Sequence, residues 1–266
     1  MSALSGKEKL QQTEQAGPDV CAFANAVAGD LELLALLHDK EPSAEVVGAV
    51  QAGPVQDQLG LVLVQDAGLA ALEALWLAAN ALPRPVTHAA LDDLAAGYAD
   101  VYLNHTYRAA PTESVWLTDE GLERQEPMLQ VRAFYRRHKL KVADAANRPD
   151  DHLVLQLRFI AHLLRGEDAA GADLSTPDLS AAARFMDEHI LKWASLHARR
   201  LMVARAPDWY AALSLVTSSY LDEVRDHLTA LTGIERPRTE AVAAKPDAAC
   251  AADSERPYVP GVAPSW

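Results

Sequence analysis

Apolar residues recur every three or four positions along most of the chain, which is the spacing of one face of an α-helix. This spacing predicts helices over 18–40, 66–82, 88–105, 127–138, 149–164, 178–205 and 207–231, with a shorter helix after Pro42. The run LGLVLV at 59–64 fits either a short strand or a buried helical segment. We find no internal repeat and no convincing pair of strands. The predicted fold is therefore all-α, with eight or more helices.

Composition divides the chain into three parts. Residues 1–17 are polar and are expected to be frayed, and 18–235 carry the helical pattern. Prolines punctuate an alanine-rich stretch over 236–266, which we interpret as an irregular tail without a core of its own. The sequence thus predicts a single-domain helical bundle with a Pro-rich C-terminal tail.

Four tryptophans give specific expectations about packing. Trp76, Trp193 and Trp209 sit on helical stripes and are expected in the core. Trp116 is expected to be partly buried, and Ser114 to be the N-cap of a short helix that begins near Val115.

Charge and cysteine content narrow the classes of function. The formal net charge is −13, so the surface repels phosphate backbones and general nucleic-acid binding is not expected. The two cysteines, Cys21 and Cys250, have no neighbouring cysteine, which disfavours a zinc site or a disulfide framework. The first residues lack a signal-peptide pattern, and we expect no membrane span, because no run approaches the ~20 apolar residues that a span needs. We expect a cytoplasmic protein without stable membrane insertion.

Enzyme motifs are absent from the sequence. It contains no GxGxxG, GxxxxGK[ST], GxSxG or HExxH pattern, and no E-x-x-H pair of the kind found in di-iron bundles. Glu223 and His227 have the spacing of two ligands on one helix face, but such a pair is more often a solvated one. We therefore expect no metal and no cofactor. A helical metal- or haem-binding enzyme remains the alternative, as does a generic helical interaction protein.

The segment RPDDHLVLQLRFIAHLL at 148–164 combines a helix start with a buried stripe. Pro149 suits the first helical position, and Asp150 and Asp151 then fall in the first turn, where they favour the positive end of the helix dipole. The expected buried face comprises Leu153, Leu157, Ile160 and Leu164. This interpretation leaves His152 without a structural role.

Two separated motifs together resemble the TorD/DmsD family of redox-enzyme maturation chaperones. ESVWLTDEG at 113–121 precedes the PDDH helix start by about the family's distance, and HILKW at 189–193 and APDWYAALSLV at 206–216 are weaker matches. The similarity spans roughly 90–231. The chain departs from the family where YADVYLNH at 98–105 lacks a glycine, and where Arg148 replaces a glutamate.

The resemblance implies a chaperone that is not an enzyme. Members bind the twin-arginine signal peptide of a molybdopterin oxidoreductase catalytic subunit. They hold the apo-form until its molybdenum cofactor is inserted, and some bind guanine nucleotide weakly. The signal-peptide site implied for this chain comprises Asp151, His152, Pro149, Trp116, Ser114, Tyr98, Tyr102, Tyr107 and Pro111.

Physical chemistry supports such a site independently. A twin-arginine leader has a cationic start and an apolar stretch, so its groove needs apolar walls and acids at one end. The expected groove is apolar and ringed by acids around Asp151, which would pair with an arginine of the leader. His152 would hydrogen-bond the peptide or brace the loop.

Overall fold

The computed structural model describes residues 6–143, 145–166 and 178–237, and within these ranges it holds helices and no strand. The α-helices are α1 (Gly6–Asp39), α2 (Ala44–Ala52), α3 (Asp66–Asn80), α4 (His88–Tyr98), α5 (Glu113–Leu117), α6 (Glu126–Arg137), α7 (Leu153–Arg165), α8 (Leu179–Glu188), α9 (Ala194–Val203) and α10 (Asp208–Thr232). Three short turns complete them: η1 (Val55–Gln58), the π-helical η2 (Ala99–Leu103) and η3 (Ile190–Lys192). The all-α prediction is confirmed. The predicted tail, 236–266, lies almost wholly outside the described residues.

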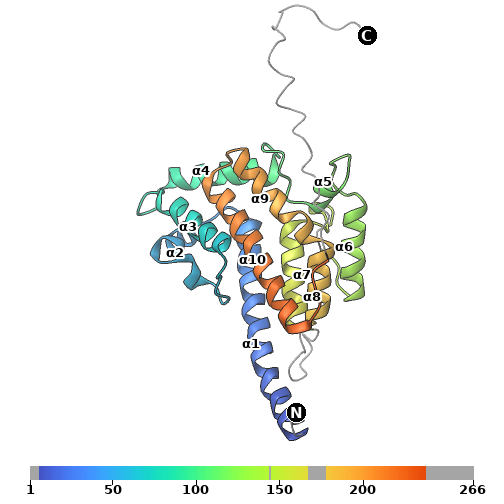
Figure 1. Ribbon diagram of the computed structural model, residues 1–266. Helices are drawn as coiled ribbons and strands as arrows, with labels where there is room; N and C mark the ends of the chain where they lie inside the picture. The colour runs from blue at the N-terminus through green and yellow to red at the C-terminus, as the bar shows by residue number, and fades with distance from the viewer. Residues whose placement is uncertain (1–5, 144, 167–177, 238–266) are drawn as a thin grey trace, which may run out of the picture.

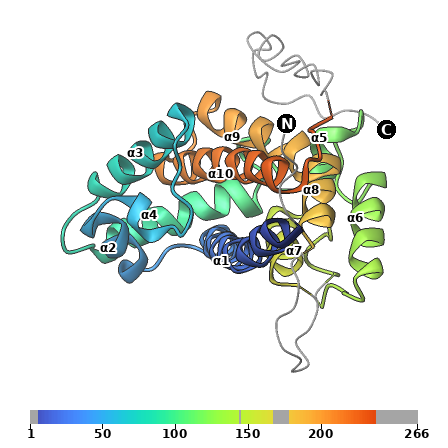
Figure 2. The ribbon, with the colours of Figure 1, turned by 60° about the horizontal axis from the view of Figure 1, so that its bottom comes forward.

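Helix α10 occupies the centre of the bundle (Figure 1). It packs against α3 on one side and against α8 and α9 on the other, while α1 lies along α7. Figure 2 shows α1 nearly end-on, between the α2–α4 side and α7, with α6 as the outermost helix beyond α8. The two lobes, α2–α4 and α6–α8, are thus joined through α1 and α10.

The core is continuous through both lobes. Phe159 of α7 packs its ring 4.7 Å from those of Tyr135 and Phe185, which joins α6, α7 and α8. Trp193 and Trp209 are buried, as predicted. The stripe of α7 is confirmed as the buried face, because Leu153, Leu157, Ile160 and Leu164 are at most 2 % exposed.

Two buried carboxylates hold the ambiguous segment 59–64 in an irregular, extended conformation. Asp30 of α1 accepts hydrogen bonds from the backbone N–H groups of Gly60 and Leu61. Glu223 of α10 accepts from those of Val64 and Gln65, at the start of α3. Glu223 is therefore a structural acceptor, and the described residues contain no group of three potential metal ligands.

Two predicted helix boundaries were wrong. Helix α1 begins at Gly6, so Pro18 lies inside it and the described part of the polar segment, 6–17, is helical. The predicted helix 178–205 is broken into α8, η3 and α9. The break occurs at His189, whose backbone leaves the helical region (φ −129°, ψ −93°) and whose ring bonds Glu113 at 2.9 Å. This buried pair outweighs the local helical preference.

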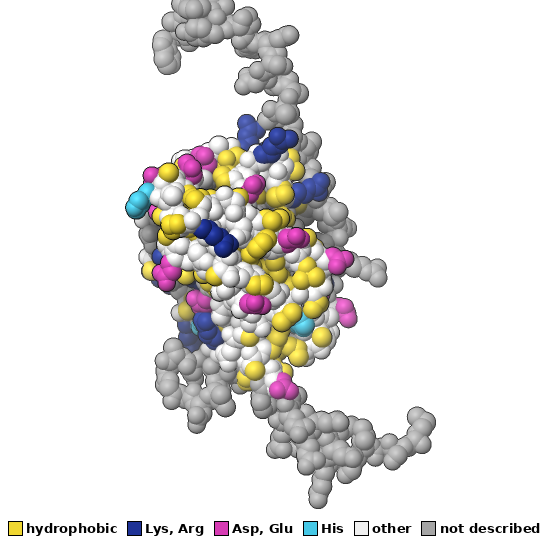
Figure 3. Space-filling view, turned by 90° about the vertical axis from the view of Figure 1, so that its left-hand side faces the viewer, with side chains coloured by type: hydrophobic (Ala, Val, Ile, Leu, Met, Phe, Trp, Pro, Cys, Tyr) yellow, Lys and Arg dark blue, Asp and Glu magenta, His cyan; other side chains and the backbone are white. Residues whose placement is uncertain are grey.

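Trp76 was also wrongly assigned to the core. It is 38 % exposed on α3, and Leu69 on the same helix is 46 % exposed. Both line a shallow hollow of about 480 Å³ between α3 and the α2–η1 segment. The space-filling view of this side shows apolar side chains interspersed with acidic and basic ones (Figure 3).

One segment of α1, Asp19–Asp39, is long and apolar enough to cross a membrane. This overturns the expectation that no run approaches that length. The finding is weak by itself, because a buried core helix passes the same test. Here Val27, Leu31 and the polar His38 are fully buried in the bundle.

The buried ion pair between α10 and α8 supplies a stability prediction. Arg225 is fully buried and donates to both carboxylate oxygens of Asp187, at 2.9 and 2.7 Å. Arg225→Leu leaves that carboxylate unpaired, so we expect the free energy of unfolding to fall by about 3–5 kcal/mol in chemical denaturation.

An exposed pair provides the control for this measurement. Arg165 and Glu32 pair at 2.6 Å with side chains 46 and 43 % exposed. Arg165→Leu should cost at most ~1 kcal/mol, because solvent screens the pair. Equal losses in the two variants would contradict the prediction.

Candidate functional site

A cross-connection between two distant segments organises the candidate site. The backbone N–H of Leu153 donates to the Pro111 carbonyl at 2.8 Å, and Thr112 forms an isolated antiparallel bridge with His152. The Asp151 carboxylate accepts from both the backbone N–H and the hydroxyl of Ser114, at 2.7 and 2.6 Å. The ESVW segment and the PDDH turn are thus one structural unit.

The acids of this unit are directed inward. Asp151 is fully buried, and Asp150, which is 3 % exposed, accepts from Arg132 at 2.8 Å. Glu113 is 1 % exposed, and its carboxylate accepts from Gln156 and bonds His189. Burial raises the pKa of Asp151 and of Glu113, against the hydrogen bonds that favour their charged forms. These carboxylates are bonded within the protein, and none of the three lines the cavity beside this turn.

The helix start differs from the prediction. Helix α7 begins at Leu153, so Pro149, Asp150 and Asp151 form the preceding turn. His152 is the N-cap, with Nδ1 accepting from the backbone N–H of Val154 at 3.2 Å. Ser114 lies within α5 and makes no N-cap bond. His152 therefore has the structural role that the sequence left open, and its accepting Nδ1 places the proton of the neutral ring on Nε2.

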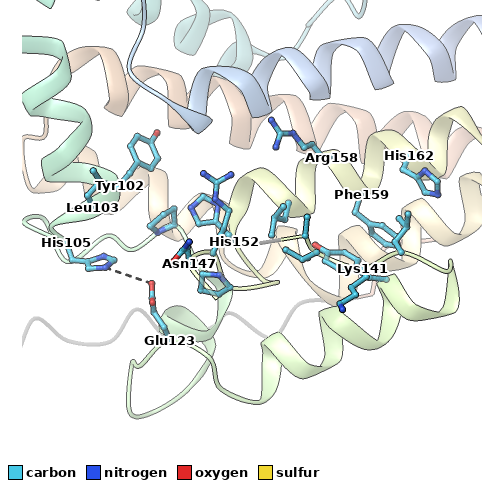
Figure 4. A pocket seen from close by; sticks show the side chains of 18 of the residues that line it. Tyr102, Leu103, His105, Glu123, Lys141, Asn147, His152, Arg158, Phe159 and His162 are labelled. Atoms are coloured by element: carbon cyan, nitrogen blue, oxygen red, sulfur yellow. Dashed lines mark ion pairs between the residues drawn. The ribbon is translucent and has the colours of Figure 1, made fainter. Parts of the chain in front are cut away.

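A cavity of about 860 Å³ opens beside this turn. Its walls come from η2, α7, the connector 140–149 and the loops around Pro111 and Glu123 (Figure 4). The apolar and aromatic part of its lining is Tyr98, Tyr102, Leu103, Pro111, Tyr135, Leu140, Val142, Ala143, Pro149, Leu155 and Phe159. A volume of this size is typical of a ligand site.

The cavity gathers five of the nine expected site residues: Tyr98, Tyr102, Pro111, Pro149 and His152. The other four lie outside its lining. Trp116 is partly buried, as predicted, and its Nε1 donates to the Ala110 carbonyl at 2.9 Å. The Tyr107 carbonyl accepts from Arg200. Ser114 bonds Asp151, the neighbour of His152 in the sequence, in the buried interior.

The charges facing the cavity differ from the expected ring of acids. Lys141, Arg148 and Arg158 line it, with Glu123 as the carboxylate in the lining. Asp39, at the end of α1, pairs with Arg148 at 2.5 Å and with Arg158 at 2.9 Å. Burial acts to raise the pKa of Asp39, but these two guanidinium groups outweigh it and lower that pKa. The acidic net charge therefore does not extend to this cavity.

Sequence reasoning missed the connector and the outer flank of α7. Leu155, Phe159 and His162 recur at helical spacing beside the buried stripe, and this second stripe was the available signal. Glu123 carried no signal, because only the folded loop brings it near His105, 3.9 Å away (Figure 4).

The buried state of His152 predicts a pH dependence. Burial, reinforced by the charge of Arg148, lowers the pKa of His152 to about 3. Below the usual histidine pKa of 6.5 the unfolded chain takes up a proton that the folded chain excludes, so stability falls as pH drops from 6.5 towards 3. His152→Asn keeps an N-cap but cannot titrate. The variant should lose about 1.4 kcal/mol less per pH unit between pH 6 and pH 4.5.

Chemical denaturation at several pH values measures this difference. His152→Ala removes both the cap and the titration, so it should be less stable than the Asn variant by about 0.5–2 kcal/mol at every pH. Its pH slope should match that of His152→Asn. A wild-type slope in both variants would refute the assignment.

Comparison with known proteins places this site in a family. The model of the nitrate reductase delta subunit family matches residues 65–199, just over half of the 266-residue chain. Chaperone protein TorD of Vibrio cholerae serotype O1 is 33 % identical over 134 residues, covering 49 % of this chain and 60 % of the relative. A probable Tat proofreading chaperone DmsD of Haemophilus influenzae is 28 % identical over 113 residues, covering 42 % and 50 %. The similar region thus spans 60 % or less of these two relatives' lengths. The chain belongs to the nitrate reductase delta subunit family, which includes the TorD and DmsD chaperones.

Proposed function

We propose that this protein is a chaperone that binds the twin-arginine leader of a molybdoenzyme catalytic subunit before export and assists insertion of its molybdenum cofactor. The observation that carries this proposal is an open cavity with apolar walls next to the PDDH turn, in a chain of the TorD/DmsD family. The protein acts in the cytoplasm, where such a client is made, and catalyses no reaction itself.

Different parts of the cavity lining suit the apolar stretch and the arginines of the leader. Leu103, which is exposed, and Leu140 and Leu155, which are half-buried, offer apolar surface for the leader's apolar stretch. Tyr98, Tyr102 and Phe159 lie behind them as buried walls. The leader's arginines do not suit the floor, where Arg148 and Arg158 already share Asp39. They are better placed at the mouth, near Glu123, whose side chain is 37 % exposed. Asp151 then supports the site from below.

Binding of a synthetic twin-arginine leader tests the charge part of the proposal. Glu123→Gln removes the carboxylate and should weaken binding by about 3- to 10-fold at low salt, since an arginine loses a charged acceptor. Glu126→Gln, an exposed change three residues away on α6, is the matched control and should leave the dissociation constant unchanged. Isothermal titration calorimetry measures both.

A second leader-binding experiment tests the cavity itself. Leu103 lines the cavity and is 62 % exposed, so Leu103→Trp adds bulk at the mouth without disturbing the core. We expect at least tenfold weaker binding. Leu129→Trp, at a 47 % exposed position outside the lining, should bind as the wild type does. Normal binding by the Leu103 variant would place the leader elsewhere.

The basic side of the cavity favours guanine nucleotide as a second, weaker guest. Lys141, Arg148 and Arg158 offer donors for phosphate oxygens. The nucleotide and the leader would then compete for the cavity. Displacement of bound leader by guanosine triphosphate measures this competition.

A further inference from the structure

The turn between α9 and α10 carries an exposed patch that the proposed cavity does not use. We name it the arginine tip and define it as Arg108, Arg199, Met202, Val203 and Arg205. Met202 is 50 % and Val203 65 % exposed, and the three arginines are exposed as well. Arg199, Met202 and Val203 lie three and four residues apart, so they share one face of α9. Lys and Arg side chains gather at the upper end of the molecule in Figure 3, the end at which α9 meets α10 in Figure 1.

Charge is segregated at this end of an acidic protein. The chain carries a net charge of −13, yet residues 189–207 contain Lys192, Arg199, Arg200 and Arg205 and no acid. The loop before Pro111 adds Arg108, and Arg200 holds that loop against α9 by donating to the Tyr107 carbonyl at 3.1 Å. Residues 100–108 and 189–208, which hold the tip, contain five Lys and Arg and two acids, Asp100 and Asp208. Asp208 is exposed, and Asp100 bonds Thr106. The local excess remains positive.

The backbone at Arg205 gives an independent observation. Helix α9 ends in a Schellman motif, in which Ala206 N–H donates to Leu201 and Arg205 N–H to Met202. Arg205 occupies the left-handed position, at φ 53°, where glycine is the unstrained residue. Arg108 is likewise left-handed, at φ 51°. Both positions therefore hold an arginine at a conformational cost that glycine would avoid.

We infer that the arginine tip contacts an anionic lipid surface. Basic side chains around an exposed aliphatic pair are the chemistry of a reversible interfacial contact, in which the arginines meet lipid phosphates and the aliphatic side chains enter the headgroup region. Five residues fall short of the 20–30 per side in a specific protein interface. Single-stranded nucleic acid would call for exposed aromatic rings, and the tip has none. The contact is independent of the leader cavity.

Vesicle co-sedimentation of the full chain tests the inference. We expect binding to vesicles that contain phosphatidylglycerol, weakened by salt, and none to vesicles of phosphatidylcholine alone. Each basic residue near an anionic surface contributes about fivefold in affinity, so Arg199→Glu with Arg205→Glu should weaken binding by ~25-fold or more. Arg136→Glu with Arg184→Glu makes the same change of charge at exposed positions away from the tip, and should lower binding far less.

Two further variants separate lipid contact from misfolding and from simple polyanion binding. Arg205→Gly relieves the left-handed strain, so it should raise the Tm by about 1–3 °C while lowering vesicle binding about fivefold. Met202→Ser with Val203→Ser should lower vesicle binding but leave the affinity for a single-stranded RNA unchanged. Wild-type vesicle binding by both Arg205→Gly and Met202→Ser with Val203→Ser would overturn the inference. Equal binding to vesicles with and without the anionic lipid would overturn it as well. Tighter binding to RNA than to vesicles also overturns it.

Discussion

The connection between the ESVW segment and the PDDH turn determines where the candidate site lies. The Asp151 carboxylate accepts hydrogen bonds from the backbone N–H and the hydroxyl of Ser114, and the Leu153 N–H donates to the Pro111 carbonyl. These bonds join segments about 40 residues apart into one unit. Pro149 and His152 form part of the cavity wall because this unit fixes their backbone. The unit is buried, and a buried carboxylate without its donors is strongly destabilising. The motif is therefore structural first, and the cavity depends on it.

Electrostatics within the molecule are strongly local. The acids beside the site are bonded to partners inside the protein: Asp150 accepts from Arg132, and Glu113 bonds His189. What remains at the cavity surface is mainly basic, although the whole chain is acidic. Net charge is consequently a poor guide to the guest of this cavity, and the apolar walls and Glu123 carry more of the argument for a leader.

Local pattern predicted most of the fold and only part of the site. Helical spacing identified the buried stripe of α7 and the courses of α3 and α10, since these features depend on residues close in sequence. It failed at His189, where a partner 76 residues away breaks the expected helix. It also did not predict the partner of Asp151, because Ser114 lies 37 residues away in the sequence. Helical spacing cannot predict such bonds, because their partners are distant in the sequence.

The packing of α1 on α7 has a consequence for the newborn chain. Helix α1 packs mainly on α7, which begins more than 110 residues after α1 ends, at Leu153. At typical rates of bacterial synthesis, α1 emerges from the ribosome on the order of 10 s before its partner. Throughout that interval the nascent protein presents an apolar helix of membrane-spanning length, Asp19–Asp39, with only its few polar side chains opposing insertion. A protein proposed to shield the export sequence of another is thus, early in its own synthesis, exposed to the same risk of mistargeting.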